Sequence, residues 1–549
     1  MIEKIKKYIW LFSIVKYLSM ILLTCLTYLT TKNLGLVIVG LLELGIIFII
    51  SNALLYTNKI FAYIFNVLLL FLYSVEQVVL IFGNSYLSLI MLSNLDSISA
   101  LSGKFGLYFS LIIPLIVILL LPIKEVNLSW KRSLGIIILE FLWILSLFGL
   151  KEVTTSPFFN YYDLVNQKIE QEKVSWKISH SKNVTAEFYK SEVANYTSKP
   201  TNLSDKPNII LILTEGLSEE FVDDKRNITP NIRMLREKSI NFTNYYNHTF
   251  ATYRGIRGQL YSGYQFENYD KNTLVSIEDI LKDSGYDTTF INTEPANLTF
   301  SNYLKQMNFD EVTYQTKDRK GVNDTMSDKE AYQFLMKYSE EKDSDVPFFI
   351  TMYTFGTHTS LDSTDKKFGN GKNSQLNRVY NMDYQFGKFV EQFNRSPISD
   401  NTILIFTTDH ATHVNSDYIK TYPNHTRGNE AVGQVPLFIY YKNGTSQTIN
   451  ANGRNSLDLA PTILDYVDIS APNYFLGTSL FSNKESSLYS HIFSSETNIM
   501  TTKGGKLSNL SKSELKKVKK KIQKYNIAQI QPQKVKKRIE KYDVAQIQP

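Results

Sequence analysis

The first 150 residues limit the possible fold more than any other part of the chain. Five apolar runs there are long enough to cross a bilayer, and they cover residues 8–31, 34–55, 60–82, 107–122 and 133–150. The fourth run is the shortest and contains Pro114. The first run lacks the small-residue cleavage pattern of a signal peptide, so we expect it to stay in the protein. This pattern predicts a five-span transmembrane domain at residues 1–150 and excludes a purely cytosolic enzyme.

Basic residues around the apolar runs predict the orientation of the chain, because Lys and Arg gather on the cytoplasmic side of a membrane. One set of loops carries Lys4, Lys6, Lys7, Lys59, Lys124, Lys131 and Arg132, whereas the alternate loops carry Lys32 and Lys104. The N-terminus is therefore predicted to be inside, and five crossings place everything after Leu150 outside. Within the runs, Glu43 and Glu76 fit either an ion pathway or a packing contact between helices.

Cysteine content and charge narrow the class of protein further. Cys25 is the only cysteine, so neither a disulfide framework nor a cysteine-based zinc site forms within one chain. A large cysteine-free region outside a membrane suits a bacterium that does not rely on disulfides. The net charge of +7, much of it from the C-terminal tail, fits either a nearby anionic surface or a solvated basic surface.

After the apolar runs, the composition changes twice. Residues 151–206 form a predicted polar, extracytoplasmic linker. Residues 207–506 alternate short β-branched runs with amphipathic stretches, which is typical of an α/β domain with a mostly parallel central sheet and helices on both faces. The predicted strands are 208–213, 288–292, 347–354, 402–407 and 435–441, and the predicted helices include 230–238, 276–284 and 375–393.

The basic tail at residues 507–549 contains a 17-residue repeat, in which residues 517–532 and 534–549 have nearly the same sequence. Two copies are too few for a solenoid. Each Lys-rich half favours a short basic helix that ends before a proline. The tail fits either attachment to an anionic membrane or polymer, or a mobile solvated extension.

Acidic and imidazole side chains follow two of the predicted strands. Glu215 comes directly after the strand at 208–213, in Thr214-Glu-Gly, and Asp409 and His410 follow the strand at 402–407. Ligands in α/β sheets bind beyond the carboxyl ends of the strands. Two carboxylates and an imidazole there can converge on a divalent cation. Mixed O/N ligation favours Mn²⁺, with Zn²⁺ or Mg²⁺ as alternatives.

Thr252 is the candidate fourth ligand and nucleophile, in the segment His248-Thr-Phe-Ala-Thr-Tyr-Arg-Gly-Ile-Arg-Gly258. A hydroxyl bound to a divalent metal loses its proton more readily than a free one. The segment from Thr252 is predicted to start a helix, whose free N–H groups favour an anionic phosphate. Arg254 and Arg257 are candidate substrate-binding residues that add positive charge near the transferring oxygens.

This combination resembles the lipoteichoic acid synthase group of the sulfatase/alkaline-phosphatase superfamily, over roughly residues 1–485. The resemblance implies a sulfatase-like domain in which Glu215, Asp409 and His410 bind the metal. It also implies that Thr252 is the nucleophile and that His358, in Thr354-Phe-Gly-Thr-His-Thr, binds substrate. Asp458-Leu-Ala-Pro-Thr and Gly477-Thr-Ser-Leu-Phe are further landmarks. The group implies a bacterial, Gram-positive cell membrane.

The sequence departs from the group at one cluster. A Trp-Asn-Arg-like motif that helps hold glycerol phosphate in the family is replaced by Ser301, Asn302 and Tyr303. This difference favours a phosphoglycerol transferase that decorates a surface polysaccharide over a polymerase. His413 and His425 are candidates for lining the substrate cleft or for general acid catalysis.

The function expected from these features is metal-dependent transfer of phosphoglycerol from phosphatidylglycerol, through a phospho-threonine intermediate, to a cell-surface glycan or teichoic-acid-type polymer. Such transfer would be part of cell wall biogenesis. The alternatives within the fold are a phosphoethanolamine transferase and a phosphodiesterase or sulfatase-type hydrolase. Outside it, a non-catalytic polymer-binding membrane protein is the alternative. No nucleic-acid partner is expected.

Overall fold

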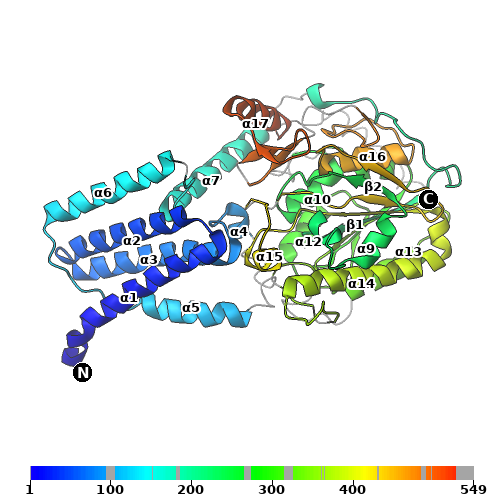
Figure 1. Cartoon of the computed structure of the whole chain (residues 1–549). Helices are drawn as coiled ribbons and strands as arrows, with labels where there is room; N and C mark the ends of the chain where they lie inside the picture. Colours follow the sequence, from blue (N-terminus) through cyan, green and yellow to red (C-terminus); the bar gives the residue numbers. More distant parts are fainter. Residues whose placement is uncertain are drawn as a thin grey trace, which may run out of the picture. The chain divides into compact units, whose positions relative to one another are not determined.

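The computed structural model describes residues 2–93, 105–150, 152–180, 186–264, 274–314, 325–359, 361–363, 365–428, 432–483, 490–495 and 498–526. The chain divides into two compact units (Figure 1). The apolar unit comprises Met1–Leu95, Gly103–Ile169 and Val414–Asn429. The α/β unit comprises Asp96–Ser102, Glu170–His413 and Glu430–Pro549. The segment at 414–429 thus belongs with the apolar helices, although the predicted domain boundaries at 207 and 506 enclose it.

The apolar unit is built from helices. They are α1 (Ile2–Thr31), α2 (Leu34–Leu55), α3 (Lys59–Gly83), α4 (Leu89–Ser93), α5 (Phe105–Leu119), α6 (Trp130–Gly149) and the first half of α7 (Pro157–His180). α2 and α3 begin where the side chains of Asn33 and Asn58 accept hydrogen bonds from the first free backbone N–H groups. Large apolar side chains are exposed along α1, α3 and α6, which suits helix surfaces in contact with lipid.

Four of these helices are long and apolar enough to cross a membrane, namely Tyr8–Thr31, Leu34–Leu55, Lys59–Gly83 and Trp130–Gly149. The predicted span at 107–122 corresponds to α5, which has 15 residues and contains Pro114. A helix of this length rises about 22 Å, which is less than the ~30 Å hydrocarbon core of a bilayer. Among the described residues, four helices therefore reach the length of a span, and α5 is a shorter apolar helix at the fifth predicted span. That α5 also crosses the membrane stays a prediction.

The carboxylates inside this unit are bonded to the backbone near the start of α7. Glu43 accepts a hydrogen bond from the N–H of Phe158 at 3.2 Å. Glu76 accepts from the N–H of Leu87 at 2.9 Å and from the side-chain amide of Asn160 at 2.9 Å. These bonds satisfy buried oxygens with N–H donors. They support packing between segments as the role of Glu43 and Glu76, the second of the two interpretations from sequence.

The α/β unit contains an eight-stranded sheet in the order β4-β3-β5-β1-β6-β7-β2-β8. The strands are β1 (Asn208–Thr214), β2 (Ile240–Thr243), β3 (Asp287–Ile291), β4 (Glu311–Thr313), β5 (Phe348–Thr354), β6 (Thr402–Thr408), β7 (Phe438–Tyr440) and β8 (Gln447–Asn450). The first five strands of that order are parallel, and β7 pairs antiparallel with both of its neighbours. The predicted mostly parallel sheet is confirmed, and each of the five predicted strands is present.

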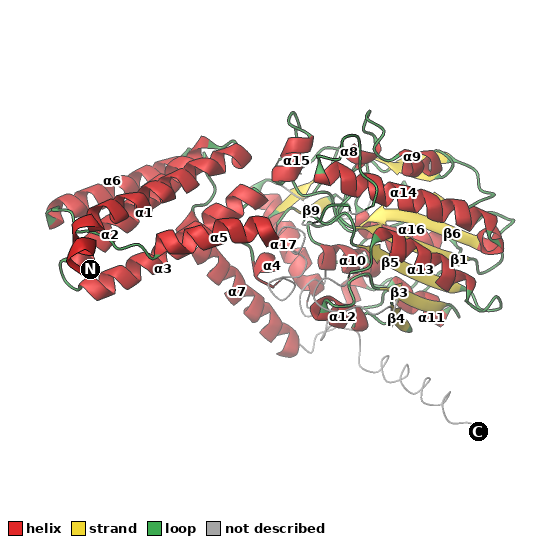
Figure 2. Cartoon of the chain, turned by 90° about the horizontal axis from the view of Figure 1, so that it is seen from below, coloured by secondary structure: helices red, strands yellow, loops and turns green. Residues whose placement is uncertain are grey.

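Helices cover both faces of this sheet (Figures 1 and 2). One layer holds α9 (Pro230–Arg236), α13 (Asp328–Glu340) and α14 (Ser374–Arg395), and the other holds α10 (Thr252–Tyr261), α11 (Ile277–Asp283) and α16 (Leu459–Tyr466). The three predicted helices correspond to α9, α11 and α14. A capping box between Ser276 and Asp279 starts α11. The main apolar core lies between the sheet and the layer that contains α10.

A smaller, C-terminal part completes the α/β unit. It contains the three-stranded sheet of β9 (His491–Phe493), β10 (Ile499–Thr501) and β11 (Ser508–Asn509), followed by α17 (Lys512–Asn526). α17 covers the first part of the repeat and packs onto the unit through three buried side chains. The rest of the tail, residues 527–549, lies outside the described residues.

Candidate active site

The sheet brings the two predicted ligand-bearing strand ends together. β1 lies between β5 and β6. Just past the strands, the N–H of Glu215 donates to the carbonyl of Thr354 at 3.2 Å, and the N–H of Asp409 donates to the carbonyl of Thr214 at 3.2 Å. The parallel pairing therefore continues one residue beyond β1 and β6. It fixes the backbone at both Glu215 and Asp409.

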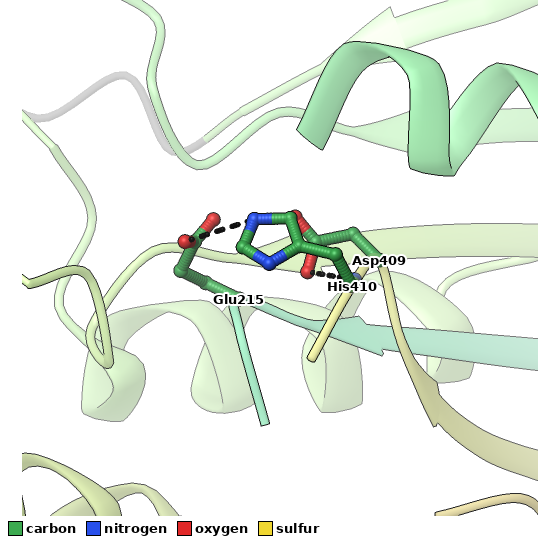
Figure 3. A group of neighbouring side chains, drawn as sticks. All are labelled: Glu215, Asp409 and His410. Atoms are coloured by element: carbon green, nitrogen blue, oxygen red, sulfur yellow. Dashed lines mark hydrogen bonds and ion pairs between the residues drawn. The ribbon is translucent and has the colours of Figure 1, made fainter. Parts of the chain in front are cut away.

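Glu215, Asp409 and His410 form a buried trio at this edge (Figure 3). One ligand atom from each lies within 4.8 Å of the others. Nε2 of His410 is 3.5 Å from Oε1 of Glu215 and 3.4 Å from Oδ2 of Asp409. The exposed fractions of the three residues are 3%, 0% and 1%. These are distances at which one cation can bridge two oxygens and a nitrogen.

Hydrogen bonds orient two of these side chains toward the centre of the trio. Oδ1 of Asp409 accepts from the N–H groups of Gly216 at 2.8 Å and His410 at 2.7 Å, whereas buried Oδ2 makes no hydrogen bond with the described residues. Nδ1 of His410 lies 2.8 Å from the carbonyl of Ala411. A ring nitrogen that donates to a carbonyl carries the proton, so Nε2 keeps its lone pair. Oδ2 and Nε2 are thus available to a metal ion.

The electrostatics of the trio favour a positive charge at its centre. Burial and the neighbouring Asp409 carboxylate raise the pKa of Glu215, and His410 and His358 oppose this shift. Two carboxylates in a water-poor site repel each other unless a cation offsets their charge. Oδ2 of Asp409, Nε2 of His410 and the oxygens of Glu215 therefore fit a divalent cation.

Thr252 stands next to the trio as the first residue of α10, where the sequence predicts a helix start. Its hydroxyl donates to Oε2 of Glu215 at 3.2 Å and lies 3.4 Å from Nε2 of His410. The residue is half-buried, so the hydroxyl is accessible. Thr252 thus has the geometry of a nucleophile beside a candidate metal site.

Two glycines and a buried histidine hold α10 in this position. A Cβ at Gly255 would lie 2.2 Å from the carbonyl oxygen of Asp409, and one at Gly258 would lie 1.9 Å from Nε2 of His248. Nδ1 of His248 is 2.6 Å from the hydroxyl of Ser456. Burial lowers the pKa of His248 to about 3, so the ring is neutral and acts as a packing element.

Tyr353 is a contact of the trio that the sequence does not single out. Its hydroxyl donates to Oε2 of Glu215 at 2.5 Å, and the hydroxyl of Thr357 donates to the carbonyl of Glu215 at 2.5 Å. Tyr353 is the penultimate residue of β5 and is 1% exposed. The signal in the sequence was its place at the carboxyl end of a predicted strand. Only the strand order shows that this strand lies next to β1.

Glu294 is a second acidic residue near the trio, three residues beyond β3. It is 6% exposed, and its carboxylate accepts from the side-chain amide of Asn297 at 3.3 Å. Burial raises its pKa to about 8, and repulsion from Glu215 and Asp409 adds to the shift. Glu294 therefore lies within electrostatic range of the candidate metal site, on the side of β3.

The three further histidines occupy different places. His358 is half-buried, stacks on Phe355 with ring centroids 4.6 Å apart and interacts electrostatically with Glu215. The ring of His413 lies 4.9 Å from that of His410. His425 belongs to the apolar unit, where its Nδ1 is 3.1 Å from the carbonyl of Arg427. The structure thus brings His358 and His413, but not His425, together with the trio inside one unit.

The arginines of α10 lie against aromatic rings. The guanidinium of Arg254 lies 5.7 Å from the ring centroid of Phe250 and 6.0 Å from that of Phe493, and the residue is 8% exposed. The guanidinium of Arg257 lies 4.3 Å from the ring centroid of Tyr261, and the residue is 1% exposed. These contacts bury both side chains around α10, which gives them a packing role that the sequence did not indicate.

Comparison with known proteins agrees with this geometry. Residues 207–469, just under half of the chain, match the family model described as Sulfatase. A protein named phosphoglycerol transferase I from Escherichia fergusonii is 25% identical over 317 residues, which are 50% of this chain and 39% of that protein. The chain thus spans well under half the length of this curated relative.

Two solved structures align with the chain. A protein of the alkaline phosphatase superfamily from Vibrio parahaemolyticus aligns with a TM-score of 0.50 and 18% identity, over 66% of this chain and 97% of that one. The lipoteichoic acid synthase LtaP from Listeria monocytogenes aligns with a TM-score of 0.46 and 16% identity, over 65% of this chain and 97% of that one.

Proposed function

Because residues 207–469 match the Sulfatase family model and follow membrane-length apolar helices, we propose that this chain is a membrane-bound, metal-dependent phosphotransferase. It transfers phosphoglycerol from phosphatidylglycerol to a cell-surface glycan or teichoic-acid-type polymer. The observation that carries the proposal is the position of the Thr252 hydroxyl, 3.2 Å from Glu215 and 3.4 Å from His410, beside the buried trio. The relative named phosphoglycerol transferase I supports the choice of transferred group.

Glu215, Asp409 and His410 hold the cation, for which mixed oxygen and nitrogen ligation favours Mn²⁺. A bound divalent cation lowers the pKa of a neighbouring hydroxyl and offsets negative charge on a transferring phosphoryl group. Thr252 Oγ1 attacks the phosphorus of the donor, a P–O bond forms, and the bond to the diacylglycerol oxygen breaks. Diacylglycerol leaves with a proton, and phosphoglycerol stays on Thr252.

An acceptor hydroxyl then attacks the same phosphorus and releases Thr252 with its proton restored. The buried trio keeps this centre largely away from water, which favours transfer over hydrolysis. His358 interacts electrostatically with Glu215, and the ring of His413 lies 4.9 Å from that of His410. We assign both histidines to contacts with the transferring group or the acceptor. The four membrane-length helices keep the domain beside its lipid donor. We assign the α/β unit to the outside of a bacterial cell membrane, from the distribution of Lys and Arg around the apolar runs.

The test uses the purified full-length chain in detergent, with Mn²⁺ and with fluorescent phosphatidylglycerol as the donor. We expect diacylglycerol release and a glycerol-phosphate adduct on the protein by intact mass. Thr252→Ala should lose both, whereas Thr243→Ala should lose neither. Thr243 is a matched control because it is a half-buried threonine on β2, three strands from β1. Release without any need for Thr252 or metal would refute the proposal.

Phosphoethanolamine transfer is the second candidate, and Glu294 is the observation that favours it. Glu294 is buried, its pKa is raised to about 8, and it interacts electrostatically with Glu215 and Asp409. An ammonium-bearing headgroup bound at this carboxyl group would favour its ionised form and offset its charge. The same assay with fluorescent phosphatidylethanolamine separates the two donors. A Thr252-dependent adduct with the mass of phosphoethanolamine, and none from phosphatidylglycerol, would replace the first candidate by the second.

A further inference from the structure

The C-terminal repeat has no part in the proposed chemistry, yet the structure shows how its first copy binds. α17 carries residues 517–526 of that copy and packs onto the α/β unit through Val518, Ile522 and Tyr525. Their exposed fractions are 8%, 4% and 0%. These positions are spaced four and three residues apart, so they share one face of the helix. We call the surface beneath them the α17 groove. Phe188, Tyr264, Leu274, Leu457 and Tyr474 belong to the same buried apolar cluster as these three side chains.

Tyr525 is the deepest anchor in the α17 groove. Its ring meets Phe188 edge-on with centroids 5.1 Å apart, and its hydroxyl donates to the carbonyl of Tyr474 at 3.2 Å. A Cβ at Gly263 would lie 2.1 Å from the hydroxyl oxygen of Tyr525, so a glycine is required there. At the rim, Nζ of Lys524 is 3.2 Å from Oε2 of Glu187. The groove thus recognises an aromatic anchor in a specific position.

The second copy of the repeat carries the same anchors. The two copies differ only at 521/538, 523/540, 526/543 and 527/544, and two of these differences replace an amide by a carboxylate. A shift of 17 residues places Val535, Ile539 and Tyr542 at the three anchor positions, and Lys541 at that of Lys524. The side chains that contact the groove are therefore present in both copies. The four positions that differ lie outside the three anchor positions.

We propose that residues 534–549 are an alternative ligand for the α17 groove of the same chain. The residues that precede each copy favour binding of the first copy over the second. Ser511 and Glu514 bond to each other at the start of α17, and Leu515 is partly buried against the same cluster. The position equivalent to Leu515 before the second copy is Pro532. The first copy therefore occupies the groove in the structure. The second copy binds there when a change weakens binding of the first copy.

Occupancy of the α17 groove matters to the rest of the unit because of its neighbours. Tyr264 and the Gly263 contact lie directly after α10, the helix that begins with Thr252. A bound helix in the groove covers this end of α10. A duplicated ligand keeps that support in place if one copy is lost by proteolysis or by mutation.

Cysteine crosslinking with a short bis-maleimide tests this assignment in the full chain, with Cys25→Ala as background. A crosslinker is used because a contact between the tips of a lysine and a glutamate leaves their Cβ atoms too far apart for a direct disulfide. Glu187→Cys is combined with Lys524→Cys to trap the first copy or with Lys541→Cys to trap the second. With unchanged anchors, we expect the 187–524 crosslink to form and the 187–541 crosslink to be at least tenfold less abundant. After Tyr525→Ala, the 187–541 crosslink should rise severalfold. Adding Tyr542→Ala should remove that rise.

Ile522→Ser is a second way to weaken the first copy, should Tyr525→Ala impair folding. A 187–541 yield that neither variant raises, while the 187–524 control forms in the unchanged chain, would overturn the proposal. A 187–541 crosslink found only in covalent dimers would also overturn it, since the segment would then bind a second copy of the chain. Peptide mapping by mass spectrometry distinguishes these products. The experiment does not depend on catalytic activity.

Discussion

Removal of one hydroxyl, by Tyr353→Phe, tests whether the trio is a metal site tuned by its surroundings. The hydroxyl donates to Oε2 of Glu215 at 2.5 Å. Burial and the Glu215 carboxylate raise the pKa of Tyr353 well above its usual value, so the phenol keeps its proton and remains a donor across the working pH range. Phenylalanine keeps the ring and its edge-on contact with Phe300, at 5.5 Å between centroids. The substitution therefore removes a hydrogen bond and almost nothing else.

The expected loss follows from the charge of the acceptor. A hydrogen bond to a charged group contributes about 1.5–3 kcal/mol, and about 1.4 kcal/mol corresponds to a tenfold change in affinity. The hydroxyl of Thr252 still donates to Oε2 at 3.2 Å in the variant, which limits the loss. We expect metal affinity to fall about tenfold, at the lower end of the 10- to 100-fold range for partners that orient metal ligands.

The assay is a titration of metal-free full-length protein with Mn²⁺, followed by electron paramagnetic resonance of the free ion. Activity measured in parallel should need about tenfold more metal for its half-maximum, while kcat at saturating metal stays near that of the unchanged protein. Tyr245→Phe is the matched control, because Tyr245 is fully buried and its hydroxyl has no hydrogen-bond partner among the described residues. Unchanged metal affinity in Tyr353→Phe would refute the reasoning.

Two further predictions concern stability and topology. Burial raises the pKa of Asp328 from 3.8 to about 7, so the folded protein holds a proton there that the unfolded chain releases, and stability falls as pH rises from about 4 to about 7. Asp328→Asn should therefore raise the melting temperature at pH 8 more than at pH 5; an equal shift at both would contradict this sign. For topology, a membrane-impermeant maleimide on intact cells, in a Cys25→Ala background, should label Ser191→Cys and spare Lys124→Cys until lysis. Protection of position 191 would mean an even number of crossings, with α5 not spanning the membrane.

The sequence predicted the centre of the sheet well and its rim poorly, for a physical reason. β1, β5 and β6 are buried on both faces, so they appear as continuous apolar runs. β2 and β8 are four-residue strands near one edge with alternating or exposed side chains, and such short patterns resemble loops.

The candidate site shows the same division between local and long-range information. Glu215, Asp409 and His410 follow strands directly, so their convergence could be inferred from sequence. The contact between Tyr353 and Glu215 could not be inferred, because it depends on β5 lying next to β1. The order of strands along the chain does not specify which strands are neighbours in a sheet. Arg254 stays a predicted substrate-binding residue, and its contacts with the rings of Phe250 and Phe493 could not be inferred from the sequence, because they depend on tertiary packing.

The pairing of β1 with β6 has a consequence for how the protein is made. The hydroxyl of Thr408 donates to the carbonyl of Thr214 across a separation of 194 residues. At 5–20 residues per second, synthesis of that interval takes about 10–40 s. During this time the apolar β1 lacks the neighbour that completes its ladder, and Asp409 and His410 do not yet exist. The nascent chain therefore passes through a prolonged aggregation-prone stage before all the residues of the candidate metal site are present.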